Sequence, residues 1–127
     1  MNISHIAIYT KELEAMKSFY CHYFKGVSNT KYVNSVKEFE SYFIQFDNGA
    51  KLELMSKRGI TKPAETMEYT GFSHIAFKLD SMQSVLDLTE ILPKDGITVA
   101  GEPRTTGDGF FESLVLDPEG NRVELTA

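Results

Sequence analysis

Cysteine is almost absent from this sequence, and long apolar runs are missing altogether. Cys21 is the only cysteine among 127 residues, so no disulfide can form within the chain. No apolar run approaches the roughly 20 residues that a membrane-spanning helix needs. No basic segment followed by an apolar one marks a secretory leader. We therefore expect a cytoplasmic protein that does not bind membranes.

Positive charge is also scarce. The chain has 13 Lys and Arg against 18 Asp and Glu, which gives a net charge of −5, and no basic run stands out. This balance argues against nucleic acid as a partner. Hydrophobic residues nevertheless make up 42% of the chain, enough for a packed core. The length fits a single domain, or two half-domains that share a core.

What the sequence does contain is an internal repeat. The phrase ISHIAI around His5 returns as FSHIAF around His74. Each copy is followed, at almost the same distance, by a glutamate between two aliphatic residues, Glu53 in Leu-Glu-Leu and Glu124 in Val-Glu-Leu. Such self-similarity indicates two copies of one structural unit. We expect a single domain over residues 1–127, with module 1–58, module 71–127 and a polar linker 59–70.

Hydrophobic periodicity predicts the order β-α-β-β-β in each module. In the first module, the strand of His5 precedes a helix that Gly26 ends. The expected helix and later strands are Lys11–Phe24, Thr30–Val36, Glu38–Phe46 and Ala50–Met55. Asp47-Asn48-Gly49 is expected to form the last hairpin turn.

The second module repeats the pattern. Asp80-Ser81 is expected to cap a helix that ends near Pro93. A loop is expected from Gly101 to Gly109, and a turn over Asp117–Asn121. The expected strands after the helix are Ile97–Val99, Phe110–Leu116 and Arg122–Thr126. The fold class is therefore α+β.

Alternation along each strand predicts which side chains share a face. The aliphatic face of each sheet covers its helix, so His5 and Glu53, and likewise His74 and Glu124, lie on the other face. Four further residues are expected on that second face as substrate contacts: Ser41, Phe43, Phe111 and Ser113. A curved sheet would turn this face into a small-molecule pocket.

Two imidazoles and two carboxylates are enough ligands for one metal site. The set His5, Glu53, His74 and Glu124 suits zinc, nickel, cobalt or iron, and it leaves positions for water or substrate. A carboxylate beside a divalent metal can also accept a proton, so Glu53 or Glu124 could double as a general base.

These residues resemble the vicinal oxygen chelate superfamily, which includes glyoxalase I, fosfomycin-resistance proteins, methylmalonyl-CoA epimerase, extradiol dioxygenases and bleomycin-resistance proteins. The resemblance covers nearly the whole chain. It rests on the paired SHIA phrases, on Phe19-Tyr20 in the helix, and on the Asp117–Asn121 turn before Val123-Glu124-Leu125. It implies tandem βαβββ modules that form an open, curved mixed sheet around a divalent metal, often in a homodimer.

Within the superfamily, the four ligand candidates match the His/Glu/His/Glu pattern of small bacterial glyoxalase I enzymes. The resemblance implies a metal-dependent lyase that isomerises a thiol–methylglyoxal hemithioacetal to a 2-hydroxyacyl thioester. It implies one Zn, Ni or Co ion per site, favours Glu124 as the base, and gives Glu53 a share in proton transfer.

One departure and several alternatives remain. Glyoxalase I often has an arginine soon after the first His, but Ile6–Thr10 has no basic residue. The sequence therefore does not identify which thiol forms the substrate. An epimerase usually has a different residue at the position of Glu53. A thiol transferase or an iron dioxygenase needs only two His and one Glu. A non-enzymatic bleomycin binder generally lacks the ligands.

Overall fold

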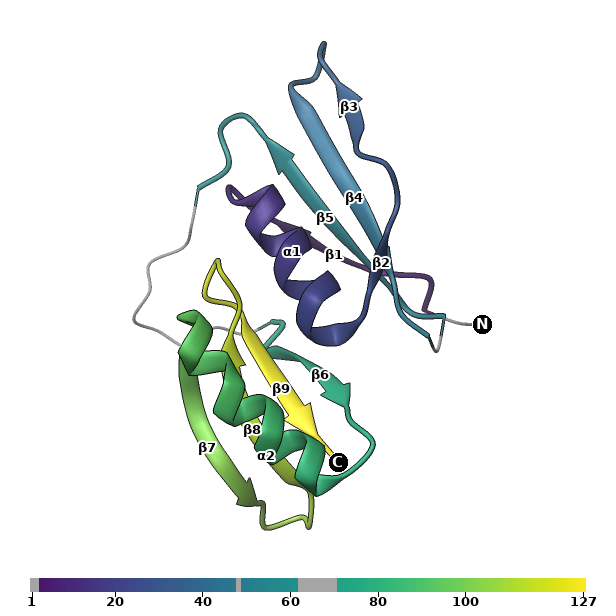
Figure 1. Ribbon diagram of the computed structural model, residues 1–127. Helices are drawn as coiled ribbons and strands as arrows, with labels where there is room; N and C mark the ends of the chain where they lie inside the picture. Colours follow the sequence, from purple (N-terminus) through teal and green to yellow (C-terminus); the bar gives the residue numbers. More distant parts are fainter. Residues whose placement is uncertain (1–2, 48, 62–70) are drawn as a thin grey trace. The chain divides into compact units, whose positions relative to one another are not determined.

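The structure is a computed structural model that describes residues 3–47, 49–61 and 71–127. The chain divides into two compact units, one on each side of residue 65 (Figure 1). Of the expected linker 59–70, residues 62–70 lie outside the described residues, as does Asn48 of the first hairpin turn. In the described part of the chain, no helix has the length and apolar content needed to cross a membrane.

Unit 1 is a five-stranded mixed sheet with one helix. Its elements are β1 (Ile6–Tyr9), α1 (Leu13–Phe24), β2 (Val27–Ser28), β3 (Tyr32–Asn34), β4 (Phe39–Gln45) and β5 (Lys51–Lys57). The strand order is β1-β5-β4-β2, and β3 also pairs with β4. β1 runs parallel to β5, whereas the other pairs are antiparallel. The single strand expected over Thr30–Val36 is shorter, and the small strand β2 was not expected.

The core of unit 1 lies between α1 and one face of the sheet. Met16 and Tyr20, one helical turn apart, are fully buried, as are Ile44 of β4 and Leu54 of β5. Burial of each such side chain contributes about 1.5–3 kcal/mol. The face that carries Ile44 and Leu54 is therefore fixed toward the helix, and the alternate residues of both strands lie on the other face.

The end of α1 differs from the expectation that Gly26 stops the helix. The helix ends at Phe24, and Lys25 takes the left-handed conformation, with φ 57°, while its N–H bonds the Tyr20 carbonyl oxygen. Gly26 is buried, and a Cβ at this position would collide with the Ile44 side chain. Glycine is needed here because the chain passes close to β4.

Unit 2 repeats this plan. Its elements are β6 (His74–Lys78), α2 (Met82–Ile91), the 3-10 helix η1 (Leu92–Asp95), β7 (Val99–Thr105), β8 (Phe111–Leu116) and β9 (Arg122–Thr126). The strand order is β6-β9-β8-β7, with β6 parallel to β9 (Figure 1). The predicted α+β class and the β-α-β-β-β order of the second module are confirmed.

Two local predictions in unit 2 have different outcomes. Ser81 caps α2 as expected, because its hydroxyl accepts the N–H of Ser84 at 3.1 Å. The loop expected over Gly101–Gly109 is wrong, since β7 continues to Thr105. The pairing of β7 with β8 shifts register on both sides of Gly101, and these irregularities hid the strand from a simple alternation pattern.

The face predicted for β8 is also wrong. Ser113 pairs opposite Leu125, whereas Leu114 pairs opposite Glu124, so Phe111 and Ser113 lie on the helix side of the sheet. Ser113 is fully buried there, and its hydroxyl lies 2.7 Å from the hydroxyl of Thr89 on α2. Phe111 and Ser113 therefore do not share the face of Glu124, and the premise for their substrate contact fails.

The buried hydroxyl pair gives a stability prediction. The Thr89 hydroxyl also donates to the Val85 carbonyl oxygen at 2.6 Å, so it keeps one partner when Ser113 is replaced. We expect Ser113→Ala to lower the free energy of unfolding by about 1 kcal/mol, the usual net value of one hydrogen bond. Urea unfolding measures this change. Ser35→Ala, at an exposed position, is the control, and an unchanged midpoint for Ser113→Ala would contradict the assignment.

An exposed ion pair links α1 to the sheet of unit 1. Lys31 Nζ lies 2.5 Å from Glu14 Oε1, and the Tyr42 hydroxyl donates to the same oxygen at 3.1 Å. The Lys31 hydrogen bond lowers the pKa of the Glu14 carboxyl below its ordinary value of 4.5, against a smaller opposing effect of desolvation. The ionised carboxylate therefore stabilises the folded state.

The sign of this linkage gives a pH prediction. Because the folded pKa of Glu14 is depressed, its contribution is present above the unfolded pKa and is lost as pH falls through the folded pKa. We expect Glu14→Gln to remove less than about 1 kcal/mol at neutral pH and to make unfolding less dependent on acid. Urea unfolding from neutral pH to about pH 3 checks this, with exposed Glu102→Gln as the control. If the free energy of unfolding falls equally with decreasing pH in wild type and in Glu14→Gln, the linkage is contradicted.

Candidate metal centre

The first histidine and the first glutamate lie side by side in unit 1. β1 and β5 pair in parallel with Ala7 beside Glu53, and His5 precedes β1 directly. His5 Nε2 lies 3.6 Å from Glu53 Oε2. The His5 side chain is 40% exposed and that of Glu53 is 16% exposed. The imidazole is thus open to a ligand, while the carboxylate is held in the sheet surface.

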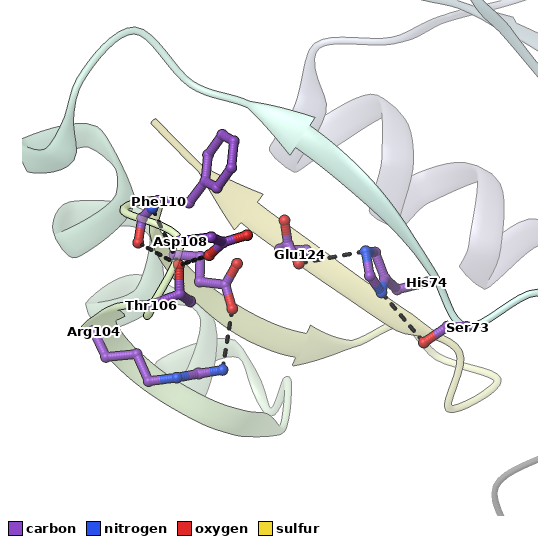
Figure 2. Close-up of polar contacts among 8 residues, drawn as sticks. Ser73, His74, Arg104, Thr106, Asp108, Phe110 and Glu124 are labelled. Carbon is purple, nitrogen blue, oxygen red and sulfur yellow. Dashed lines mark hydrogen bonds and ion pairs between the residues drawn. The ribbon is translucent and has the colours of Figure 1, made fainter.

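Unit 2 reproduces the arrangement with the second pair. Ala76 lies beside Glu124 in the parallel pairing of β6 and β9. His74 Nε2 lies 3.4 Å from Glu124 Oε2, and the side chains are 39% and 18% exposed (Figure 2). The two pairs match in spacing, in exposure and in the strands that carry them. The structure therefore brings the four predicted residues into two equivalent pairs, one within each unit.

A serine beside each histidine contacts the other ring nitrogen. Ser4 Oγ lies 3.3 Å from His5 Nδ1, and Ser73 Oγ lies 3.3 Å from His74 Nδ1. When Nδ1–H donates a hydrogen bond to the serine oxygen, the lone pair is at Nε2, the nitrogen beside the glutamate. Metal-binding histidines are commonly oriented in this way by a partner on the second nitrogen.

The separations within the pairs suit a shared metal ion. Two donor atoms that each bind a metal at about 2.1 Å lie roughly 3.0–3.4 Å apart. The observed distances of 3.4 and 3.6 Å between nitrogen and oxygen are close to this range and are longer than those of most N–H···O hydrogen bonds. Within either unit, the described residues contain no group of three or more His, Cys, Asp or Glu side chains that could hold a metal ion. Each unit therefore offers two candidate ligands.

The face of Glu53 continues into an open groove. Phe43 of β4 lies opposite Glu53, and Ser41 lies opposite Met55, so the predicted face of both residues is confirmed. The Phe43 ring meets the His5 ring edge-on, with the centroids 5.4 Å apart. A groove of about 760 Å³ extends from Phe43. Residues that line it include Val27, Asn29, Gln45 and Lys51.

Asn29 fixes the position of Phe43. Its side-chain oxygen accepts the Phe43 N–H at 2.8 Å, and its own N–H donates to the Phe43 carbonyl oxygen at 3.0 Å. The aromatic wall beside His5 is thereby held in place by β2 and the chain just after it. The groove has the size of a small-molecule site and combines apolar walls with a few polar groups.

Sequence reasoning missed the residues that share the face of Glu124. The register of β8 with β9 places Glu112 and Leu114 on that face. Leu114 stands ten residues before Glu124, as Phe43 stands ten residues before Glu53, so the repeat itself held the signal. Arg104 of β7 lies opposite Glu112, and its Nη2 donates to Glu112 Oε1 at 3.0 Å.

The surroundings of Glu124 raise the pKa of its carboxyl above the ordinary value. The main cause is desolvation, because the side chain is largely buried in the sheet surface. The negative charge of Glu112 and a hydrogen bond with Glu112 act in the same direction, while His74 and Arg104 oppose them. A bound cation would favour the ionised form of the same carboxyl.

A buried hydroxyl without a partner lies next to this site. Among the described side chains, Thr126 Oγ1 is the buried polar atom that has no hydrogen-bond partner. Thr126 follows Glu124 by two residues on β9 and therefore points to the same face. A buried polar group of this kind normally has a partner, so a bound water or ligand at this face would satisfy it.

Taken together, two βαβββ units that each present a histidine and a glutamate from neighbouring strands define a glyoxalase-like fold. The sequence model of the Glyoxalase/Bleomycin resistance protein/Dioxygenase superfamily matches residues 2–125, and the chain belongs to this superfamily. The resemblance inferred from the sequence is thereby confirmed.

Individual relatives are distant. A Bacillus subtilis (strain 168) protein, "Uncharacterized protein YqjT", is 27% identical over 126 residues, which cover 97% of this chain and 96% of the relative. The crystal structure of the glyoxalase family protein from Enterococcus faecalis is similar with a TM-score of 0.82 and 22% identity, covering 99% of this chain and 97% of that one.

Solved glyoxalase I enzymes share the fold. Glyoxalase I from Zea mays has a TM-score of 0.79 and 23% identity, covering 97% of this chain and 43% of that chain. The trypanothione-dependent glyoxalase I of Leishmania major has a TM-score of 0.77 and 21% identity, covering 99% of this chain and 86% of that one. The chain thus spans less than half the length of the maize enzyme.

Proposed function

We propose that this protein is a metal-dependent lyase of the glyoxalase I type, which isomerises a thiol–methylglyoxal hemithioacetal to a 2-hydroxyacyl thioester. The observation that carries the proposal is the duplicated pair, with His5 beside Glu53 and His74 beside Glu124 at 3.6 and 3.4 Å. A thiol transferase of this superfamily needs only two His and one Glu, so the second glutamate is best explained by the lyase.

The donor set fits one divalent ion such as Zn, Ni or Co, held by His5, Glu53, His74 and Glu124 from one chain or from two paired chains. The ion supplies a Lewis acid that polarises the oxygens of the bound substrate. Ser4 and Ser73 keep each imidazole turned with Nε2 toward its glutamate. The sheet surface limits access of water to both carboxylates, which are the less exposed members of their pairs.

The reaction moves one proton between adjacent carbon atoms. A carboxylate takes the proton from the carbon that bears sulfur and returns a proton to the neighbouring carbon. The hydroxyl proton on the first carbon passes to the neighbouring carbonyl oxygen, so that the first oxygen becomes the thioester carbonyl and the second becomes the 2-hydroxyl. No oxidant or reductant is consumed. We assign the proton transfer mainly to Glu124, with Glu53 sharing in it.

The groove beside Phe43 provides room for the part of the substrate that does not react. Val27 and Phe43 offer apolar contacts, and Lys51 at its edge offers a cation. Phe43 and Ser41 remain our candidates for substrate contact. We assign no particular thiol to the substrate, because the first strand has no arginine after His5. A homodimer in the cytoplasm also remains a prediction.

Elemental analysis of the purified protein, followed by an assay with methylglyoxal and several thiols, tests the proposal. We expect about one divalent metal per site and formation of thioester from glutathione or from another cellular thiol. Metal without thioester formation would contradict the lyase and favour an epimerase or a thiol transferase. No bound metal under replete conditions would favour a non-enzymatic binding protein. Size-exclusion chromatography with light scattering tests the dimer.

A further inference from the structure

A lysine that takes no part in the proton transfer borders the first histidine–glutamate pair. Lys51 stands two residues before Glu53 on β5 and therefore lies on the same face, with the two Cα atoms about 7 Å apart. β5 lies between β1 and β4 in the sheet, and Ile6 of β1 lies beside Leu52 (Figure 1). The residues that precede these two, His5 and Lys51, are therefore neighbours as well.

Lys51 also lines the groove that opens beside this pair. The groove has a volume of about 760 Å³, and Phe43, whose ring meets the His5 ring edge-on, forms part of its wall. Gln45 lies directly opposite Lys51 across β4 and β5, and Val27 of β2 lies opposite Gln45. The lysine thus stands between the candidate ligand His5 and a hollow with the size of a small-molecule site.

The charge of Lys51 is not neutralised within the described residues. Its ammonium group has no hydrogen bond or ion pair there, and none joins it to Asp47, the acid that lines the same groove. Of the described strand residues that alternate onto this face of unit 1, only Lys51, Glu53 and Lys57 are charged. Lys57 lies over the Tyr9 ring, 5.0 Å from its centroid. Lys51 is therefore left as an unpaired cation in a groove, and such a charge attracts anionic ligands.

We propose that Lys51 determines specificity for the thiol half of the substrate by binding a carboxylate that this half carries into the groove. The inference rests on the proposed lyase function, for which it names the class of thiol as one with an acidic group. A lysine ammonium is a compact charge on a flexible stem, so it binds a carboxylate without the fixed geometry that an arginine requires. The acidic end of the substrate then lies toward Gln45 and Val27, away from the reacting carbons.

Two thiols that differ in one charge test this assignment. N-acetylcysteine carries a carboxylate, whereas N-acetylcysteine amide has nearly the same shape and is neutral. We expect the metal-loaded wild-type protein to convert the methylglyoxal hemithioacetal of the acid with a kcat/KM about 5-fold above that of the amide, which matches the upper range for an exposed ion pair. The difference should appear mainly in KM, because the contact lies away from the reacting carbons. Equal kcat/KM values for the two hemithioacetals would overturn the assignment.

Substitutions in the groove connect the preference for the acid to the lysine. Lys51→Met should remove this preference, and Lys51→Arg should retain most of it, because the positive charge stays. Asp47→Asn removes the acid of the same groove and should raise the preference, since a bound carboxylate is then repelled less. Lys37→Met, at an exposed position in the turn between β3 and β4, is the matched control and should change neither constant. A preference that survives in Lys51→Met would belong to another residue and would overturn the proposal.

Binding without turnover separates this inference from the proposed function. The S-methyl thioethers of the same acid and amide have no thiol and cannot react, and NMR titration of the metal-loaded protein measures their dissociation constants. Tighter binding of the acid that is lost in Lys51→Met, with no thioester formed from either thiol, would contradict the lyase and leave the anion-binding role of Lys51. Equal binding of the two thioethers, with thioester formation intact, would overturn the role of Lys51 alone. Protein that neither binds nor converts any of these compounds would overturn both.

Discussion

We expect replacement of His74 by alanine to abolish stoichiometric metal binding and, with it, thioester formation. His74 supplies one of the four proposed ligands, and its Nε2 lies 3.4 Å from Glu124. Loss of a ligand should cost more than the roughly 100-fold in metal affinity that marks the upper range for a supporting partner. Elemental analysis and chelator competition on the purified variant measure the loss, and the thiol–methylglyoxal assay follows it in activity.

His22 offers the matched control, since the chain has only three histidines. It lies in the last turn of α1 at an exposed position, and its ring packs edge-on against Tyr23. His22→Ala should keep wild-type metal content and turnover. If His74→Ala retains a full equivalent of metal while remaining folded by circular dichroism, the ligand assignment is wrong.

The second large effect is expected for Glu124→Gln. The amide keeps the shape of the side chain but cannot accept a proton from carbon, so kcat should fall by about 10²- to 10⁴-fold. Glutamine can still offer an oxygen to the metal, and a fall in kcat at saturating Ni²⁺ would therefore report lost proton transfer. Steady-state kinetics with the metal added in excess measures kcat and KM separately.

Two comparisons sharpen this result. Glu53→Gln should reduce kcat by less than Glu124→Gln does if Glu124 is the main base. Glu90→Gln, on the exposed face of α2 where it pairs with Lys94, should leave both constants unchanged. A wild-type kcat in metal-saturated Glu124→Gln would remove Glu124 from the proton-transfer step, and a larger loss in Glu53→Gln would reverse the assignment.

The site could be predicted from the sequence where the repeat and the strand alternation agree. The matched phrases around His5 and His74 gave the strand positions, and the turn after Phe46 gave the face of Phe43. In β8 the same reasoning fails, because the aliphatic Leu114 and Leu116 suggest that their face meets the helix, whereas Ser113 and Val115 are the residues buried there. Both faces of β8 are covered to some degree, so aliphatic side chains do not reveal which face meets the helix.

The register of β8 is set by the turn that follows it. The Asp117 side chain accepts the N–H groups of Glu119 and Asn121, and the Asp117 N–H donates to the Asn121 carbonyl oxygen at 3.0 Å. A shift of one residue in register moves every side chain to the opposite face. The turn therefore places Glu112 and Leu114 on the same face as Glu124. The hydrophobicity pattern of β8 does not reveal this register.

Other features depended on tertiary contacts that a local pattern does not contain. Lys25, not Gly26, adopts the left-handed conformation after α1, because Gly26 is needed for its close approach to Ile44. The Arg104–Glu112 pair joins strands whose register shifts twice along their length. Its place on the same face as Glu124 could be found only once the neighbours of each strand were known.

In both units the first strand pairs in parallel with the last one, Ile6 with Leu52 and Ile75 with Val123. Each histidine therefore meets its glutamate through the most distant strand contact of its unit, and such contacts form late and slowly during folding. A chain still emerging from the ribosome cannot present a completed ligand pair until the closing strand of that unit has been synthesised. Formation of each histidine–glutamate pair is thereby tied to completion of its unit, and a partly synthesised unit lacks the pair.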